Sequence, residues 1–366
     1  MFEVLVMAGG FLAFAMGSGF ASGQEVLRFF SLYGFWGSLG GGLLAAAIFA
    51  GTGALVAADG ARLKLAEPDL VYDHYLGKTL GTLYRLVMPI VMFLFLAVMS
   101  AGAGAAFQES FGLPNWAGIV AMMGLCFLTV CFDLRTLLQA IGGIGMLILG
   151  ASVLLSVTVL LDAWERAGGM QQLFLETDST VRAAEEAGAI GTKSAAGFSW
   201  WSAGILYASY NLLTAFPFLN GMGKEASGAG RAAWGGLLGG TFYMAGAMLM
   251  NLALRTDLAA VAESQLPLLF LAGQRASWTE GIFAFLLLGS IYTTAAPLLW
   301  SLTESLTLSK RPANRRFLAF FLACLAAVGG TLPFDRMLTA VYPLAGWAGL
   351  ILPVSAILHH FRRRFV

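Results

Sequence analysis

Charged side chains are scarce in this sequence. Asp, Glu, Lys and Arg make up 11% of the 366 residues, 58% are hydrophobic, and the mean hydropathy is +0.79. An average soluble domain is about one quarter charged, so this composition predicts an integral membrane protein. The formal net charge is +1, and no basic excess points to nucleic acid. The expected partners are the lipid bilayer and a small-molecule solute; nothing in the sequence sets an oligomeric state.

Cysteine and histidine are equally scarce, with three of each. Cys126, Cys131 and Cys324 lie in apolar stretches without CxxC spacing, and His359 and His360 lie near the C-terminal end. This pattern argues against disulfides, a transition-metal site and redox chemistry, and favours cysteines that act as small buried hydrophobes. The apolar segments also lack a His/Cys/acid cluster or paired carboxylates, so we expect no enzyme.

The apolar residues gather in segments of about twenty, the length that crosses the hydrocarbon core as a helix. Glu3 stands where a signal peptide would carry positive charge, so we expect the first segment to be retained. The sequence predicts ten transmembrane helices, at residues 4–29, 34–58, 81–107, 115–132, 136–162, 200–220, 232–254, 279–307, 315–333 and 338–360.

Lysine and arginine predict the orientation, because they favour cytoplasmic loops. With the N-terminus in the cytoplasm, 14 of the 21 basic residues fall on the cytoplasmic side. Three of the other seven, Arg166, Arg182 and Lys193, belong to one long loop, where the rule is weak. An even number of helices then places the C-terminus in the cytoplasm too.

One long polar connection divides the chain into two halves. Residues 163–199, with "TVRAAEEAGA", predict an extracytoplasmic loop that carries a short amphipathic helix. It separates one five-helix repeat at 1–162 from a second at 200–366, which ends in a basic tail. Because five is odd, equivalent helices cross the membrane in opposite directions. This is an inverted repeat, and transporters built this way hold substrate near the midplane between the repeats.

The first segment contains "GSGFASG" at 17–23, which is a poor helix sequence. Inverted-repeat transporters interrupt the first helix of each half, and unwound backbone persists at membrane depth only where protein, water or ligand covers it. Free carbonyls near residues 13–17 suit a cation, and N–H groups near residues 21–23 suit a carboxylate. A zwitterion such as an amino acid fits both. The predicted substrate contacts here are Gly17, Ser18, Gly19, Phe20, Ala21 and Ser22.

The sixth segment contains "YASYNLLTAFPFL", in which polar residues precede Pro217. Proline removes a backbone donor and clashes with the preceding turn, so we expect a bend or break near residues 211–214. Ser100, among small residues of the third segment, is a further candidate for the cavity wall. The predicted substrate contacts of the sixth segment are Tyr207, Ser209, Tyr210, Asn211 and Thr214.

Two charged residues follow the first interruption, and each has more than one interpretation. Glu25 completes the pattern Ser22-x-x-Glu25, which is typical of a capping box, and with Arg28 it has the i,i+3 spacing of a local ion pair. Alternatively, Glu25 is a gate partner or carries the coupling ion or proton. A capping box inside a spanning segment itself implies that a helix starts there.

The eighth segment places three hydroxyls near mid-membrane. Ser290, Thr293 and Thr294 lie at i, i+3 and i+4, on neighbouring parts of one helix face. Hydroxyls together with carbonyls of a broken helix form an all-oxygen site that suits a hard cation such as Na⁺. Hydrogen bonds to the helix's own backbone are the alternative role.

The stretches "GSGFASGQEVLRFF" and "YASYNLLTAFPFL" resemble the YkvI-like bacterial membrane proteins, which are grouped with amino-acid permeases of the amino acid-polyamine-organocation superfamily. The resemblance covers nearly the whole chain. It implies an all-α LeuT-type fold in the bacterial inner membrane, with a five-plus-five inverted repeat and broken helices 1 and 6. It further implies an ion site between backbone at Ala13 and Met16 and the hydroxyls of Thr293 and Thr294, and an extracellular gate at Arg28.

The sequence therefore predicts a secondary active transporter. It would move a small amino acid-like solute by alternating access, coupled to Na⁺ or H⁺ and without any other cofactor. The alternative is a membrane ligand sensor or accessory subunit with the same fold, which would bind the solute without accumulating it.

Overall fold

The computed structural model describes residues 1–67, 69–131, 134–169, 179, 196–275, 277–307 and 312–365. The regular structure in these ranges is helical throughout. The surface helix expected at 180–189 lies outside the described residues. The helices are α1 (Phe2–Ala15), α2 (Ser18–Ser22), α3 (Gln24–Phe29), η1 (Ser31–Tyr33), α4 (Gly34–Leu63), α5 (Leu70–Phe111), α6 (Asn115–Cys131), α7 (Leu134–Ala167), α9 (Trp200–Lys224), α10 (Ala229–Arg255), α11 (Leu258–Glu263), α12 (Pro267–Gly273), α13 (Ser277–Leu306), α14 (Pro312–Gly329), α15 (Phe334–Gly349) and α16 (Ile351–Phe365).

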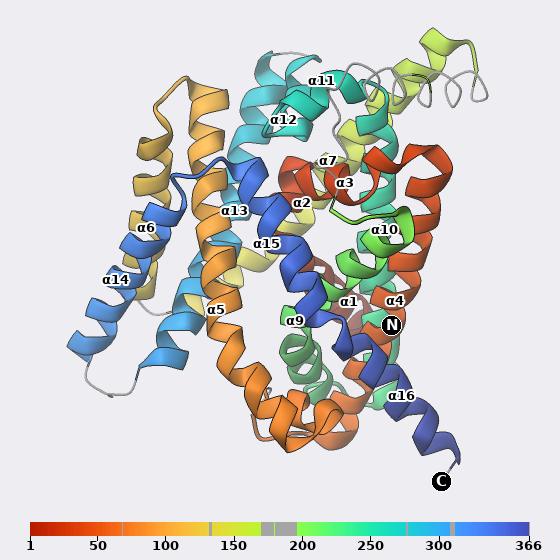
Figure 1. Cartoon of the computed structure of the whole chain (residues 1–366), viewed down its shortest axis with the longest axis vertical. Helices are drawn as coiled ribbons and strands as arrows, with labels where there is room; N and C mark the ends of the chain where they lie inside the picture. Colours follow the sequence, from red (N-terminus) through yellow and green to blue (C-terminus); the bar gives the residue numbers. More distant parts are fainter. Residues whose placement is uncertain are drawn as a thin grey trace.

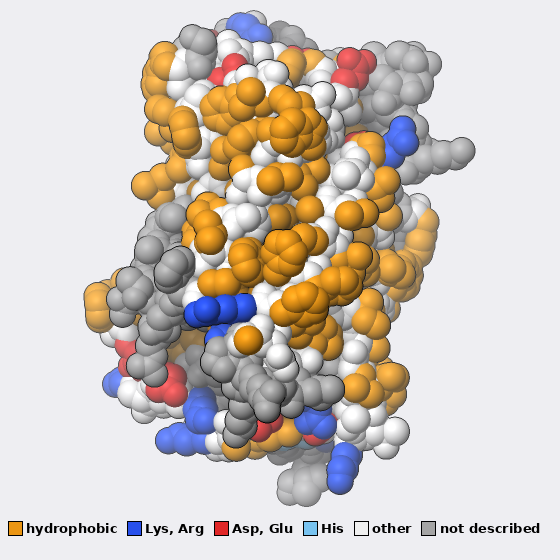
Figure 2. All heavy atoms as spheres, turned by 90° about the vertical axis from the view of Figure 1, so that its left-hand side faces the viewer, with side chains coloured by type: hydrophobic (Ala, Val, Ile, Leu, Met, Phe, Trp, Pro, Cys, Tyr) orange, Lys and Arg blue, Asp and Glu red, His pale blue; other side chains and the backbone are white. Residues whose placement is uncertain are grey.

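The chain has the composition of a membrane-spanning bundle. Apolar side chains cover the middle of the face in Figure 2, and most charged side chains there lie towards its two ends. α1 and α6 are apolar but shorter helices. Six stretches of the described chain are long and apolar enough to cross a membrane: Gln24–Leu63, Leu70–Phe111, Leu147–Ala167, Ala229–Arg255, Trp278–Leu306 and Phe334–Arg362.

The helices pack in two groups (Figure 1). In the first, α4 packs along α9 and α10, and α10 packs against α1; in the second, α5 packs against α6, α13 and α14. α15 contacts both α9 and α5. Figure 1 places α11 and α12 at the upper end of the molecule, and the α4–α5 connection (residues 64–67 and 69) at the lower end with the C-terminus. Neither α11 nor α12 was predicted, because both helices are short.

The predicted interruption of the first helix is present. α1 ends at Ala15, Met16 and Gly17 are extended, and α2 runs for only five residues before Gly23. Gly23 has a φ of 83°, a left-handed conformation that glycine adopts without steric cost. α3 then continues in a new direction. The glycine-rich sequence therefore breaks the helix at both predicted ends.

The predicted break in the sixth helix is wrong. α9 runs without interruption through residues 211–214 and Pro217. Proline at 217 leaves the carbonyl of Leu213 without its usual i+4 N–H partner. The Tyr72 hydroxyl donates a hydrogen bond to that oxygen at 2.7 Å. Because the freed carbonyl is satisfied by another helix, α9 has no need to unwind.

Candidate functional site

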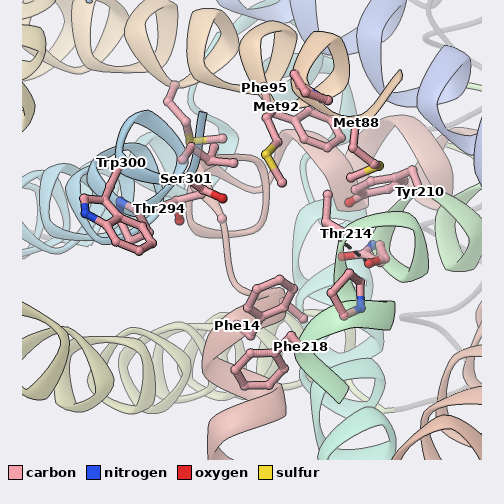
Figure 3. A pocket seen from close by; sticks show the side chains of 18 of the residues that line it. Phe14, Met88, Met92, Phe95, Tyr210, Thr214, Phe218, Thr294, Trp300 and Ser301 are labelled. Carbon is pink, nitrogen blue, oxygen red and sulfur yellow. Dashed lines mark hydrogen bonds between the residues drawn. The ribbon is translucent and has the colours of Figure 1, made fainter. Parts of the chain in front are cut away.

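A cavity of about 600 Å³ lies where the two helix groups meet. α1 and α9 contribute lining residues from the first group, α5 and α13 from the second, and α15 adds Tyr342. Figure 3 shows side chains from these elements turned towards one space. Much of the wall is apolar and includes Phe14, Met88, Met92, Phe95, Met99 and Phe218.

The cavity has an accessible end and a closed end. Asp69, in the α4–α5 connection, and Ser305, near the end of α13, line the cavity and are exposed. Glu25 and Tyr210, which also line it, are 2% and 5% exposed. The cavity is therefore accessible where Asp69 lies and closed where Glu25 and Tyr210 lie.

The Glu25 carboxyl is the chemical centre of the closed end. The Tyr210 hydroxyl donates to its Oε2 at 2.5 Å, and the backbone N–H of Phe20 also donates to the carboxyl. The carboxyl lies directly over Gly19, where an added Cβ would be 2.2 Å from Oε1. The hydroxyls of Tyr207, Tyr243 and Tyr342 lie close enough to interact with it. One buried carboxyl is thus surrounded by aromatic hydroxyls.

Neither local interpretation of Glu25 holds. Gly23 is the N-cap of α3 and there is no side-chain cap, because the Glu25 side chain turns back over α2. The predicted local pair with Arg28 is also wrong: Arg28 lies 3.7 Å from Asp335, at the start of α15, and its Nε donates to Gln24 at 3.2 Å. The sequence did not indicate Asp335 as the partner of Arg28, because Asp335 resembles an ordinary solvated helix start.

The backbone N–H groups expected to bind a carboxylate have partners within the chain. Ala21 donates to the Gly17 carbonyl at 3.0 Å, and Gly23 to the Phe20 carbonyl at 3.0 Å. The N–H of Gln24 donates to the Ser22 hydroxyl at 3.3 Å. With the Phe20 N–H facing Glu25, this part of the interruption already holds a carboxylate, which is the protein's own.

The structure brings most of the predicted ion-site residues together. Thr294 donates to the Met16 carbonyl at 3.5 Å and Thr293 to the Ser290 carbonyl at 2.9 Å. Ala13, Thr293 and Thr294 line the cavity, whereas the Ser290 side chain is fully buried. Ion binding by this group stays a prediction.

The predicted substrate contacts divide into three sets. Gly17, Tyr210, Asn211 and Thr214 line the cavity. Two other residues do not line the cavity: the Ser100 hydroxyl is directed at Gly330, where an added Cβ would meet it at 2.4 Å, and Ser209 is fully buried. The remaining residues are buried behind the cavity wall: Ser18, Gly19, Phe20, Ala21, Ser22 and Tyr207.

Several site residues were missed. Tyr243 shares a hydrogen bond with Tyr207 at 2.8 Å, and Tyr342 packs on Tyr210 with ring centroids 4.8 Å apart. A signal for Tyr342 was available, because it precedes Pro343 in an apolar segment much as polar residues precede Pro217. Tyr243 lies in an ordinary apolar helix and gave none.

Comparisons with known proteins agree with this architecture. No protein-family model matches the chain. The sequence is 22% identical over 347 residues to the uncharacterised membrane protein YkvI of Bacillus subtilis, covering 94% of this chain and 92% of that protein. It is 24% identical over 357 residues to the uncharacterised protein YyaD of the same organism, covering 94% and 93%. The resemblance inferred from the sequence is confirmed as a similarity over nearly the full length.

Solved structures show the same fold. A manganese transporter of Eremococcus coleocola aligns with a TM-score of 0.56 at 14% identity, covering 94% of this chain and 76% of that one. A Na⁺-coupled sialic acid symporter in a substrate-bound outward-open state aligns at 0.55 and 13% identity, covering 94% and 74%. These likenesses confirm the predicted all-α, LeuT-like inverted-repeat fold.

Proposed function

We propose that this protein is a secondary active transporter of a small, amino acid-like solute, coupled to Na⁺ or H⁺. The observation that carries the proposal is a cavity between two helix groups that is reached from one end and closed at the other. Alternating access requires such a state, together with a second one in which the groups have tilted to open the opposite end. The similar proteins with assigned roles are transporters, which supports the same conclusion.

The closure at the upper end combines polar contacts between separate elements with apolar packing. Gln24 donates to the Ser264 carbonyl at 2.8 Å, and the N–H of Phe334 donates to Gln265 at 3.1 Å. With the Arg28–Asp335 pair, these contacts join α3, the α11–α12 segment and α15. The apolar residues Pro267 and Leu268 of α12 also pack against Gly23. With the predicted orientation, the open end faces the cytoplasm.

The proposal is tested by uptake into proteoliposomes. Purified protein would be reconstituted with an inward Na⁺ gradient, an inward H⁺ gradient, or neither, and offered radiolabelled amino acids. We expect one gradient to drive accumulation above equilibrium, and an ionophore that collapses that gradient to abolish it. Saturable binding without accumulation under either gradient would instead favour the sensor.

A further inference from the structure

Six of the eight hydroxyl groups that line the cavity share a feature that bears on the substrate; the other two belong to Ser301 and Tyr342. Each of the six donates its single hydrogen to an acceptor of the chain: Tyr72 to Leu213 O (2.7 Å), Tyr210 to Glu25 Oε2 (2.5 Å), Thr214 to Asn211 O (3.3 Å), Thr293 to Ser290 O (2.9 Å), Thr294 to Met16 O (3.5 Å) and Ser305 to Ser301 O (2.8 Å). A hydroxyl has one donor and two acceptor lone pairs. Towards a ligand, these six oxygens can therefore act only as hydrogen-bond acceptors.

The charges of the lining point the same way. Among the described residues that line the cavity, Arg85 alone is basic, and it lies 2.9 Å from Asp73 towards the accessible end. Glu25 is the acidic residue of the closed end. A carboxylate that reached this end would meet another carboxyl group and acceptor oxygens, with no basic group to pair with, and the burial of an unpaired ion is unfavourable.

From these two observations we infer that the cavity binds an organic amine, with its ammonium group at Glu25 and its apolar body between Phe95 and Met92 of α5 and Phe218 of α9, which face each other across the space in Figure 3. The inference rests on the proposed function and sharpens it. The amine is the recognised end of the solute, and a carboxylate is dispensable. An ammonium group brings three donors and a positive charge, which complement one carboxylate and the neighbouring acceptor oxygens. The Tyr210 and Tyr342 rings beside Glu25 add faces on which a cation is stabilised.

The test uses three molecules that differ only in charge. Phenethylamine keeps the ammonium, 3-phenylpropanoate keeps the carboxylate, and phenylalanine keeps both. Binding to detergent-purified protein would be measured by thermal stabilisation over a concentration series. We expect phenethylamine to bind at least about tenfold more tightly than phenylalanine, a difference of about 1.4 kcal/mol, and 3-phenylpropanoate not to bind. A second set, 3-methylbutylamine, 4-methylpentanoate and leucine, repeats the comparison with a branched aliphatic group.

Two matched variants assign the effect to one residue. Glu25→Gln is expected to weaken binding of the amines at least about tenfold. Glu304→Gln makes the same change at an exposed carboxylate beside Arg315 and should leave binding unchanged. The ranking of ligands on the unmodified protein stands even if Glu25→Gln fails to fold. Failure of both amines to bind, preferential binding of either carboxylate, or full amine affinity in Glu25→Gln would overturn the inference.

The outcomes separate this inference from the proposed transport. Amines that bind tightly but are not accumulated by proteoliposomes would contradict transport and leave the amine site standing. Accumulation of phenylalanine by a protein that does not bind phenethylamine would support transport and contradict the amine site.

Discussion

The first helix of each half reaches the cavity, but that helix is interrupted in the first half and continuous in the second. In the first half, α1 ends before Met16 and a short α2 precedes Gly23, so backbone groups of the interruption face α13 and Glu25. In the second half, α9 passes Pro217 unbroken because the Tyr72 hydroxyl satisfies the Leu213 carbonyl. One half therefore offers the site its backbone and the other offers side chains. The difference follows from whether a neighbouring helix supplies the missing partner.

The largest effect is expected where the interruption has no room for a side chain. Gly19→Leu should abolish uptake, because even its Cβ would overlap the Glu25 carboxyl, which is itself held by Tyr210 and Phe20. Gly51→Leu is the matched control, since nothing lies within 4 Å of a Cβ at that position. Uptake of labelled phenylalanine and phenethylamine is compared after both variants elute as monodisperse protein. Normal uptake by Gly19→Leu would show that the interruption tolerates a side chain and is not the substrate site.

The unbroken helix is tested by removing its remote donor. Tyr72→Phe leaves the buried Leu213 carbonyl unsatisfied and should lower the free energy of unfolding by about 1–3 kcal/mol. Pro217→Ala restores the N–H that can bond that carbonyl within the helix, so the cost of Tyr72→Phe should shrink to less than half in the Pro217→Ala background. Thermal unfolding of the four proteins in detergent gives this cycle. If the two substitutions are additive, the tyrosine is not what keeps α9 continuous.

These two helices also show which features of the fold could be predicted from the sequence. The break in α1 was predictable because its cause is local: glycines and small polar residues fail to hold a helix at residues 17–23. The continuity of α9 was not, because its cause is a hydroxyl 141 positions away in the sequence. The fold class follows from apolar segment length, which is also local, and it was predicted.

The same distinction explains the errors within the site. The spacing Ser22-x-x-Glu25 predicts a cap only if no stronger interaction is available. In the folded chain, tyrosines of α9, α10 and α15 surround the carboxyl instead. Nothing in the sequence around Asp335 indicates its contact with Arg28, because the two residues lie in segments that only folding brings together. Polar residue types in apolar segments identify candidates, but their partners depend on tertiary packing.

A smaller loss of stability is expected at the contact between Arg28 of α3 and Asp335 of α15. Asp335→Asn removes the charge opposite Arg28, whose side chain is 8% exposed, while that of Asp335 is 31% exposed. Because Asp335 remains partly hydrated, we expect a loss of about 1 kcal/mol in stability, below the value for a fully buried pair. The adjacent Arg336→Gln, at an exposed position, serves as the control. Equal unfolding temperatures for Asp335→Asn and the unmodified protein would show that the Arg28–Asp335 pair does not stabilise the closed upper end.

The smallest change in stability, and the most specific one, is expected at Thr294. Its hydroxyl reaches the Met16 carbonyl at 3.5 Å, a long hydrogen bond, so Thr294→Val should cost only about 0.5 kcal/mol in the absence of Na⁺. If the interrupted backbone and this hydroxyl bind Na⁺, the variant should also lose the stabilisation that Na⁺ gives over K⁺ at equal ionic strength. Thr241→Val, which removes an exposed hydroxyl bonded to its own helix, should keep that stabilisation. A Na⁺ effect that survives in Thr294→Val would place the ion elsewhere, and a protein that never distinguishes Na⁺ from K⁺ would favour H⁺ as the coupling ion. In either case, the difference between the two halves would no longer include an ion site. It would consist of a first helix that glycines interrupt, as tested at Gly19, and a second that stays continuous because the Tyr72 hydroxyl bonds its free carbonyl.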